Sequence, residues 1–153
     1  MRNQKKLVVE QLDRKLKPFK GLEKIQIPEK GWINNIRLAL NMTLEQLGRK
    51  LNMTRQGIKK IEERESSGSI SLKSLKEIGK VLDMQFVYGF VPNYGSIEKL
   101  IDVKARQLAN KIIQRTNQTM LLENQENTGK QIEQAIEELS SEIKREMRKS
   151  LWD

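Results

Sequence analysis

The sequence lacks cysteine and histidine altogether and has few aromatic residues. None of its 153 residues is Cys or His, and Phe, Trp and Tyr together make up 5% of the chain. The absence of Cys excludes disulfides, thiolate nucleophiles and Cys-ligated zinc, and the absence of His removes the commonest general base and metal ligand. We therefore expect neither an enzyme nor a bound metal or cofactor.

Long apolar runs are absent as well. No run approaches the roughly 20 apolar residues of a membrane-spanning helix, and no apolar signal segment follows Met1. With 37% hydrophobic and 32% charged residues, the chain is too apolar to be disordered throughout. We expect a cytoplasmic protein without a membrane partner.

Positive charge is concentrated in the first two-thirds of the chain. The net charge is +9; residues 1–30 carry 9 Lys and Arg against 4 acids, and residues 31–92 carry 10 against 6. Residues 93–153 carry 10 of each. A polyanion would therefore bind the first two regions, although a solvated basic face explains the same charge equally well.

The N-terminal region, residues 1–30, combines a helix with a connector. An amphipathic stretch over about residues 4–16 predicts the helix, and Pro18, Gly21 and Pro28 break the pattern after it. The role of this basic helix stays open between dimerisation, contact with DNA and docking on a partner.

The middle region, residues 31–92, predicts four short helices. Apolar residues recur at helical spacing in residues 32–40, 44–51, 55–64 and 72–82. Thr43, Thr54 and Ser71 are suited to cap the last three helices, and Gln46 completes a capping box with Thr43. The serine- and glycine-rich residues 66–69 predict a loop.

The end of this region, residues 85–92, is rich in aromatic and β-branched residues and predicts one short strand. A lone strand cannot satisfy its own hydrogen-bonding ladder, and nothing else in the chain resembles a strand. We expect the same segment of a second copy to pair with it as an intermolecular ribbon, which makes the protein a homodimer. The alternative is an apolar tail packed on the helices.

The C-terminal region, residues 93–153, is rich in helix formers and predicts two long helices. The first runs from Ile97 to near Asn127, before Gly129, and the second carries an apolar stripe from Ile132 to Leu151. These helices would form a hairpin, dock on the rest of the chain or bind another protein. The expected fold is therefore mainly α, with one short strand and a C-terminal long-helix appendage.

The most specific pattern lies in the second and third helices of the middle region. The first of them ends at the break Asn52–Met53, and the next one follows at once with Ile58 and Ile61 on its buried face. Gly48 would let the two helices cross closely. This spacing predicts a helix-turn-helix, whose second helix enters the major groove of DNA.

The outward residues of that second helix suit contact with DNA. They are Arg55, Gln56, Lys59 and Lys60. Arg reads guanine, Gln reads adenine and Lys reaches phosphates, while the hydroxyl of Thr54 and the first helix amides suit a phosphate. These five residues are our candidate DNA-binding site, and double-stranded operator DNA is the expected partner.

With these residues in place, residues 32–83 resemble the phage-repressor (Xre/Cro-like) helix-turn-helix family, whose pattern residues 44–62 follow almost position by position. The resemblance implies that Arg55, Gln56 and Lys59 face bases and that Thr54 and Lys60 contact the DNA backbone. The alternative is a four-helix domain that has lost DNA binding.

Over its whole length, the chain resembles the family called mobile mystery protein A. The N-terminal helix, the entry at Trp32, the helix-turn-helix, residues 86–92 and the helical tail follow in that order. Members of this family resemble helix-turn-helix regulators encoded beside a partner with a Fic domain. Fic domains transfer AMP from ATP to hydroxyl side chains, and an inhibitory helix with the pattern Ser/Thr-x-x-x-Glu-Gly/Asn typically restrains them.

One segment of this chain matches the inhibitory pattern, Thr119-Met120-Leu121-Leu122-Glu123-Asn124. The resemblance implies that Thr119, Glu123 and Asn124 inhibit the partner. Glu123 would pair with an Arg that otherwise clamps the γ-phosphate of ATP, so the nucleotide could not align for transfer. The alternative is that Glu123 and Asn124 are ordinary solvated residues near a helix end.

Two functions follow from these patterns. The first is an antitoxin that inhibits a Fic-type toxin and also binds operator DNA as a dimer to repress its own operon. The second is a stand-alone helix-turn-helix transcriptional regulator whose C-terminal helices dimerise or sense a ligand.

Overall fold

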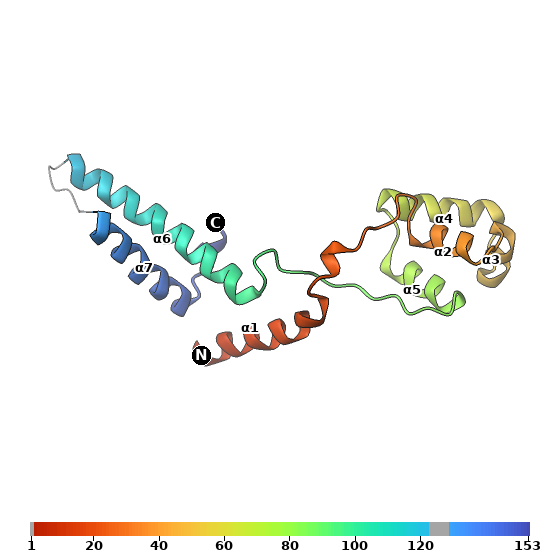
Figure 1. Cartoon of the computed structure of the whole chain (residues 1–153), viewed down its shortest axis with the longest axis horizontal. Coiled ribbons are helices and arrows are strands. Elements are labelled where there is room, and N and C mark those ends of the chain that lie inside the picture. The colour runs from red at the N-terminus through yellow and green to blue at the C-terminus, as the bar shows by residue number, and fades with distance from the viewer. Residues whose placement is uncertain (1, 123–128) are drawn as a thin grey trace. The chain divides into compact units, whose positions relative to one another are not determined.

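The structure, a computed structural model, describes residues 2–122 and 129–153 and is mainly helical, as predicted (Figure 1). It falls into two compact units. The central unit is Glu23–Tyr88, and the terminal unit joins Met1–Leu22 to Gly89–Asp153. The N-terminal helix therefore packs with the C-terminal helices, whereas the sequence pattern treated residues 1–30 as a region of their own.

The central unit contains the four helices that the apolar spacing predicts. They are α2 (Trp32–Ala39), α3 (Leu44–Leu51), α4 (Arg55–Ser67) and α5 (Leu72–Val81). Each of the four helices contributes at least one residue to the core, and Leu82 at the C-cap of α5 adds another. The core residues are Ile33, Leu47, Ile58, Ile61, Ile78 and Leu82. Burial of these apolar side chains is the main force that holds the four helices together.

The three predicted N-caps are confirmed. The hydroxyl oxygens of Thr43, Thr54 and Ser71 each accept a hydrogen bond from the backbone N–H three residues later. Thr43 and Gln46 form the complete capping box, because the Gln46 side chain also accepts from the Thr43 N–H at 2.8 Å. Caps of this kind satisfy N–H groups that have no partner within the helix.

The predicted loop at residues 66–69 is only partly correct, because α4 continues through Ser67. The helix ends where the backbone becomes left-handed at Gly68, with φ 82°. The Ser69 N–H then donates to the carbonyl of Arg64 at 2.8 Å, which closes the last turn. Helices commonly end in this way at a glycine.

The short strand predicted at residues 85–92 is not confirmed, since the part of the chain that the structure describes contains no strand. The chain reverses after α5 at Asp83, whose φ is 55°, and the Met84 N–H donates to the carbonyl of Gly79 at 2.8 Å. The following side chains then lie against α5. Phe86 stacks with Tyr88, and the ammonium of Lys76 lies 5.7 Å from the centre of the Tyr88 ring.

The terminal unit is built around an antiparallel pair of long helices (Figure 1). Its helices are α1 (Arg2–Leu16), α6 (Ile97–Leu122) and α7 (Gly129–Glu146), with short 3-10 turns at Lys17–Phe19 and Lys149–Trp152. A further 3-10 turn at Leu22–Lys24 lies at the boundary with the central unit. The core residues are Ile101, Ala105, Ala109, Ile136, Ile143 and Leu151, and Val9 of α1 packs against them. None of the helices in the described residues is both long and apolar enough to cross a membrane.

Two boundaries in this unit differ from the prediction. The second long helix was expected to carry its stripe to Leu151, but α7 ends at Glu146 and the backbone turns left-handed at Met147, with φ 50°. The 3-10 turn that follows brings Leu151 back into the core. Gly129 begins α7 instead of ending the preceding helix, whose expected end near Asn127 lies outside the described residues.

Charged side chains tie the helices of the terminal unit together. The carboxylate of Asp13 in α1 accepts hydrogen bonds from the Ile97 and Glu98 N–H groups, at 2.7 and 3.2 Å, and so caps α6 with a negative charge at its positive end. Lys144 of α7 pairs with Asp102 of α6 at 2.7 Å. This hydrogen bond is the main reason why the pKa of Lys144 lies above its ordinary value.

Candidate nucleic-acid interface

The turn between α3 and α4 brings two backbones unusually close. Asn52 adopts a left-handed conformation with φ 54°, and the Met53 N–H donates to the carbonyl of Gly48 at 2.8 Å. Gly48 is buried, and a Cβ atom there would lie 2.5 Å from the carbonyl oxygen of Met53. Gly48 was expected where the two helices cross, and a Cβ there would indeed lie 3.5 Å from Ile58 of α4. Its closest approach, however, is to the backbone of the turn that follows α3.

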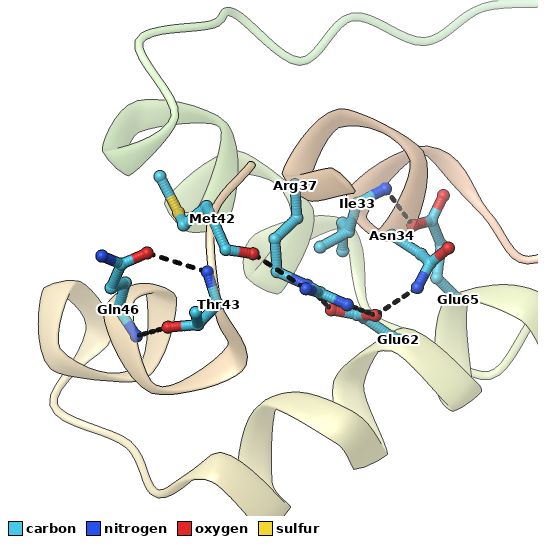
Figure 2. A network of polar contacts seen from close by, with 8 residues as sticks. All are labelled: Ile33, Asn34, Arg37, Met42, Thr43, Gln46, Glu62 and Glu65. Carbon is cyan, nitrogen blue, oxygen red and sulfur yellow. Dashed lines mark hydrogen bonds and ion pairs between the residues drawn. The ribbon is translucent and has the colours of Figure 1, made fainter. Parts of the chain in front are cut away.

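The second half of α4 is anchored to α2 by a buried ion pair. Arg37 of α2 and Glu62 of α4 are only 8% and 7% exposed, and Figure 2 shows the guanidinium facing the carboxylate. Arg37 donates to both carboxylate oxygens of Glu62, from Nε at 2.7 Å and from Nη2 at 3.1 Å. Its third bond goes to the carbonyl of Met42 at 2.9 Å, and Asn34 adds a bond to Glu62 at 2.7 Å.

A second carboxylate of α4 caps α2. The two oxygens of Glu65 accept the Trp32 and Ile33 N–H groups, at 2.7 and 2.8 Å. One residue further along α4, the Ser66 hydroxyl donates to the carbonyl of Glu29 at 3.2 Å. The beginning of α2 and the turn before it are therefore held against the C-terminal half of α4.

The sequence pattern did not predict these anchoring residues. Arg37 lies four residues after the buried Ile33, and Glu62 lies four residues after the buried Ile58. Residues four apart share one face of a helix, so two opposite charges on two buried faces were the available signal for the pair. No comparable signal points to Glu65.

The first half of α4 forms no hydrogen bond to α2, and together with its N-cap it carries all five predicted DNA-binding residues. They are Thr54, Arg55, Gln56, Lys59 and Lys60, and every one of them is exposed. Between them only Ile58 is fully buried. The structure thus brings the five together on one end of one helix, and Arg55 reaches Glu45 of α3 at 3.4 Å.

This arrangement has the chemistry of a DNA-reading surface. Exposed arginine and glutamine side chains on one face of a helix can form paired hydrogen bonds with base edges, and lysines neutralise phosphates. The ion pair with Arg55 places the carboxylate of Glu45 beside this surface, and both side chains are exposed.

The family model HTH_3, described as helix-turn-helix, matches residues 33–88. The chain contains a helix-turn-helix domain. The domain includes α2 to α5 and the segment that folds back on α5, and it indicates a DNA-binding regulator. No curated protein and no solved structure matches the chain.

The helix-turn-helix match ends before the helices that carry the inhibitory pattern. The resemblance to the mobile mystery protein A family and the Fic-domain partner therefore stay predictions. Thr119 lies in the last turn of α6, while Glu123 and Asn124 lie outside the described residues.

The close approach at Gly48 of the helix-turn-helix domain leads to a first prediction. Gly48→Ala should lower the free energy of unfolding of the central unit by about 1–3 kcal/mol, because the new methyl group meets backbone that cannot move aside easily. The measurement is urea unfolding followed by the fluorescence of Trp32, in a Trp152→Phe background that leaves one tryptophan.

Gly57→Ala in α4 is the matched control. A Cβ there would lie 3.2 Å from the Met53 methyl group, which is flexible, and alanine favours a helix by about 1 kcal/mol over glycine. We expect a small change in either direction. Equal stability of the Gly48→Ala variant and the wild type would contradict the proposed packing of the turn.

Proposed function

We propose that the chain is a cytoplasmic transcriptional repressor that reads operator DNA with the first half of α4. The observation that carries this proposal is that the two halves of α4 use their polar side chains differently. Glu62 and Glu65 hold the C-terminal half to α2, and the N-terminal half presents exposed Arg, Gln and Lys side chains. A rigidly held helix of this kind can enter the major groove without losing its own fold.

Within this proposal, the five residues have two roles. Arg55, Gln56 and Lys59 contact base edges, and Thr54 and Lys60 contact the DNA backbone. The position of Thr54 supports its contact with the DNA backbone, since Thr54 caps α4 and lies where the first helix N–H groups face outward. Lys60 is exposed and lies next to the buried Ile61, at the margin of the free surface.

We further propose that the repressor acts as a homodimer joined through residues 85–92. Within the described residues, the backbone of this segment forms one hydrogen bond, from the Gly95 N–H to the Pro92 carbonyl, so the rest of its ladder is open to a second copy. Val87 and Phe90 are 66% and 81% exposed, which leaves apolar surface for the partner to cover. A two-fold dimer would read two half-sites of a palindromic operator.

Removal of the two paired base contacts tests the DNA-reading role of α4. Arg55→Ala combined with Gln56→Ala should reduce operator affinity to that for random DNA, because each bidentate contact is worth about 1–3 kcal/mol of discrimination. The operator is first selected from a random duplex library by the wild-type protein. Affinities are then measured by fluorescence anisotropy.

Lys24→Ala combined with Gln26→Ala is the control for that experiment. It removes the same charge and the same amide from two exposed positions of the central unit that lie outside α4. We expect this variant to keep the operator preference of the wild type. If the α4 variant also keeps it, the assigned reading helix is wrong.

We propose, in addition, that the protein is the antitoxin of a Fic-domain toxin and is itself not an enzyme. The support is the whole-length resemblance to mobile mystery protein A, the inhibitory pattern at residues 119–124, and the lack of His and Cys for catalysis. The pattern lies in the terminal unit, so inhibition and DNA reading would use different units of the chain.

The inhibitory glutamate is tested by adenylylation assays of the Fic-domain protein encoded beside this chain. Wild-type protein should suppress AMP transfer, and Glu123→Gly should release it while the complex persists, because the freed Arg can again hold the ATP γ-phosphate. Glu126→Gly is the charge-matched control and should still inhibit. Equal inhibition by the Glu123→Gly variant and the wild type would contradict the motif assignment and favour a stand-alone regulator.

A further inference from the structure

A cleft of about 600 Å³ runs along α4 on the side that faces α2. One wall consists of α4 itself and includes Arg55, Gln56 and Lys59, which are three of the proposed DNA-reading residues. The opposite wall begins with Lys30 in the turn before α2 and continues with Asn34 in α2. The cleft therefore extends the reading surface to residues outside the recognition helix.

The lining of this cleft favours an anion. It contains four cationic side chains against two acidic ones, Glu62 and Glu63. Glu62 is fully occupied by Arg37 and Asn34 at the buried floor, so this pair contributes little net charge at the opening. The exposed charges that line the rim are then Lys30, Arg55 and Lys59 against Glu63. Arg55 also pairs with Glu45, which does not line the cleft.

The position of Lys30 is fixed by contacts of its neighbours with α4. The turn Pro28–Gly31 is closed by a hydrogen bond from the Gly31 N–H to the Pro28 carbonyl at 2.9 Å. The carbonyl of Glu29 accepts the Ser66 hydroxyl, and Glu65 caps the helix that begins directly after the turn. The backbone of Lys30 is therefore held opposite α4 before any ligand binds, which lowers the entropic cost of a contact.

We propose that this cleft binds the phosphodiester backbone of the DNA strand whose bases α4 reads, and that Lys30 is a phosphate contact. This inference rests on the proposed function. The sugar-phosphate backbone borders the major groove, so a cationic cleft directly beside the reading residues lies where a phosphate must pass. Lys30 attracts the phosphate and helps to position the protein on the duplex, but it does not distinguish one base sequence from another.

The test is the salt dependence of DNA binding by the full chain carrying Lys30→Gln. Loss of one phosphate contact should make the slope of log affinity against log salt less steep by about 0.9. Affinity should fall equally for the selected operator and for random duplex, so the ratio of the two affinities stays at its wild-type value. Thermal melting in the absence of DNA verifies that the variant is folded.

Two matched variants sharpen this test. Glu63→Gln removes the exposed acid of the cleft and should strengthen binding to both kinds of DNA. Lys24→Gln removes an exposed cation that does not line the cleft and should leave the salt slope as in the wild type. Opposite effects of the two cleft variants, with no effect of Lys24→Gln, support a phosphate in the cleft.

Failure of this inference is distinguishable from failure of the proposed function. If the wild type prefers its operator and Lys30→Gln keeps the wild-type salt slope, only the phosphate cleft is overturned. A changed operator-to-random ratio for Lys30→Gln would also overturn it, because Lys30 would then contact bases. If the wild type shows no preference for any duplex, both proposals fail.

Discussion

The buried pair of Arg37 and Glu62 is the interaction on which the geometry of the central unit depends. Each charge would be costly in the interior without its partner, and breaking such a pair by removing one member typically costs about 3–5 kcal/mol. Here every donor nitrogen of Arg37 has an acceptor, in the carboxylate of Glu62 or the carbonyl of Met42. Its paired hydrogen bonds fix the orientation of α4 relative to α2 as well as the distance between the two helices. Apolar packing alone does not fix this orientation.

This constraint explains how one short, polar helix can hold the domain together and also carry the proposed DNA contacts. The residues of α4 that face inward are Ile58, Ile61 and Glu62. Glu65 lies on the same side of α4, nearer its C-terminal end, and caps α2. The first half of α4 keeps four exposed polar side chains, which are Arg55, Gln56, Lys59 and Lys60. The same anchors hold the turn that carries Lys30, so the proposed base contacts and the proposed phosphate contact are positioned by one set of bonds.

The helices of the central unit and their caps could be predicted from the sequence, because apolar spacing and Thr or Ser at a helix start are local signals. Arg37 and Glu62 were missed because apolar periodicity treats a charge as exposed. The strand expected at residues 85–92 is not confirmed in the described residues, because the chain reverses at Asp83 and the segment that follows lies against α5. The packing of α1 on α6 was also beyond local patterns, since an amphipathic stripe does not identify its partner.

The most direct test of this account is amide hydrogen exchange across α2 and α4 in the Glu62→Gln variant. Exchange should be at least tenfold faster than in the wild type in both helices, because Arg37 stays buried without a counter-charge. Glu63→Gln, one residue further and exposed, should exchange like the wild type. Unchanged exchange in the Glu62→Gln variant would contradict the claim that this pair holds α4 in place.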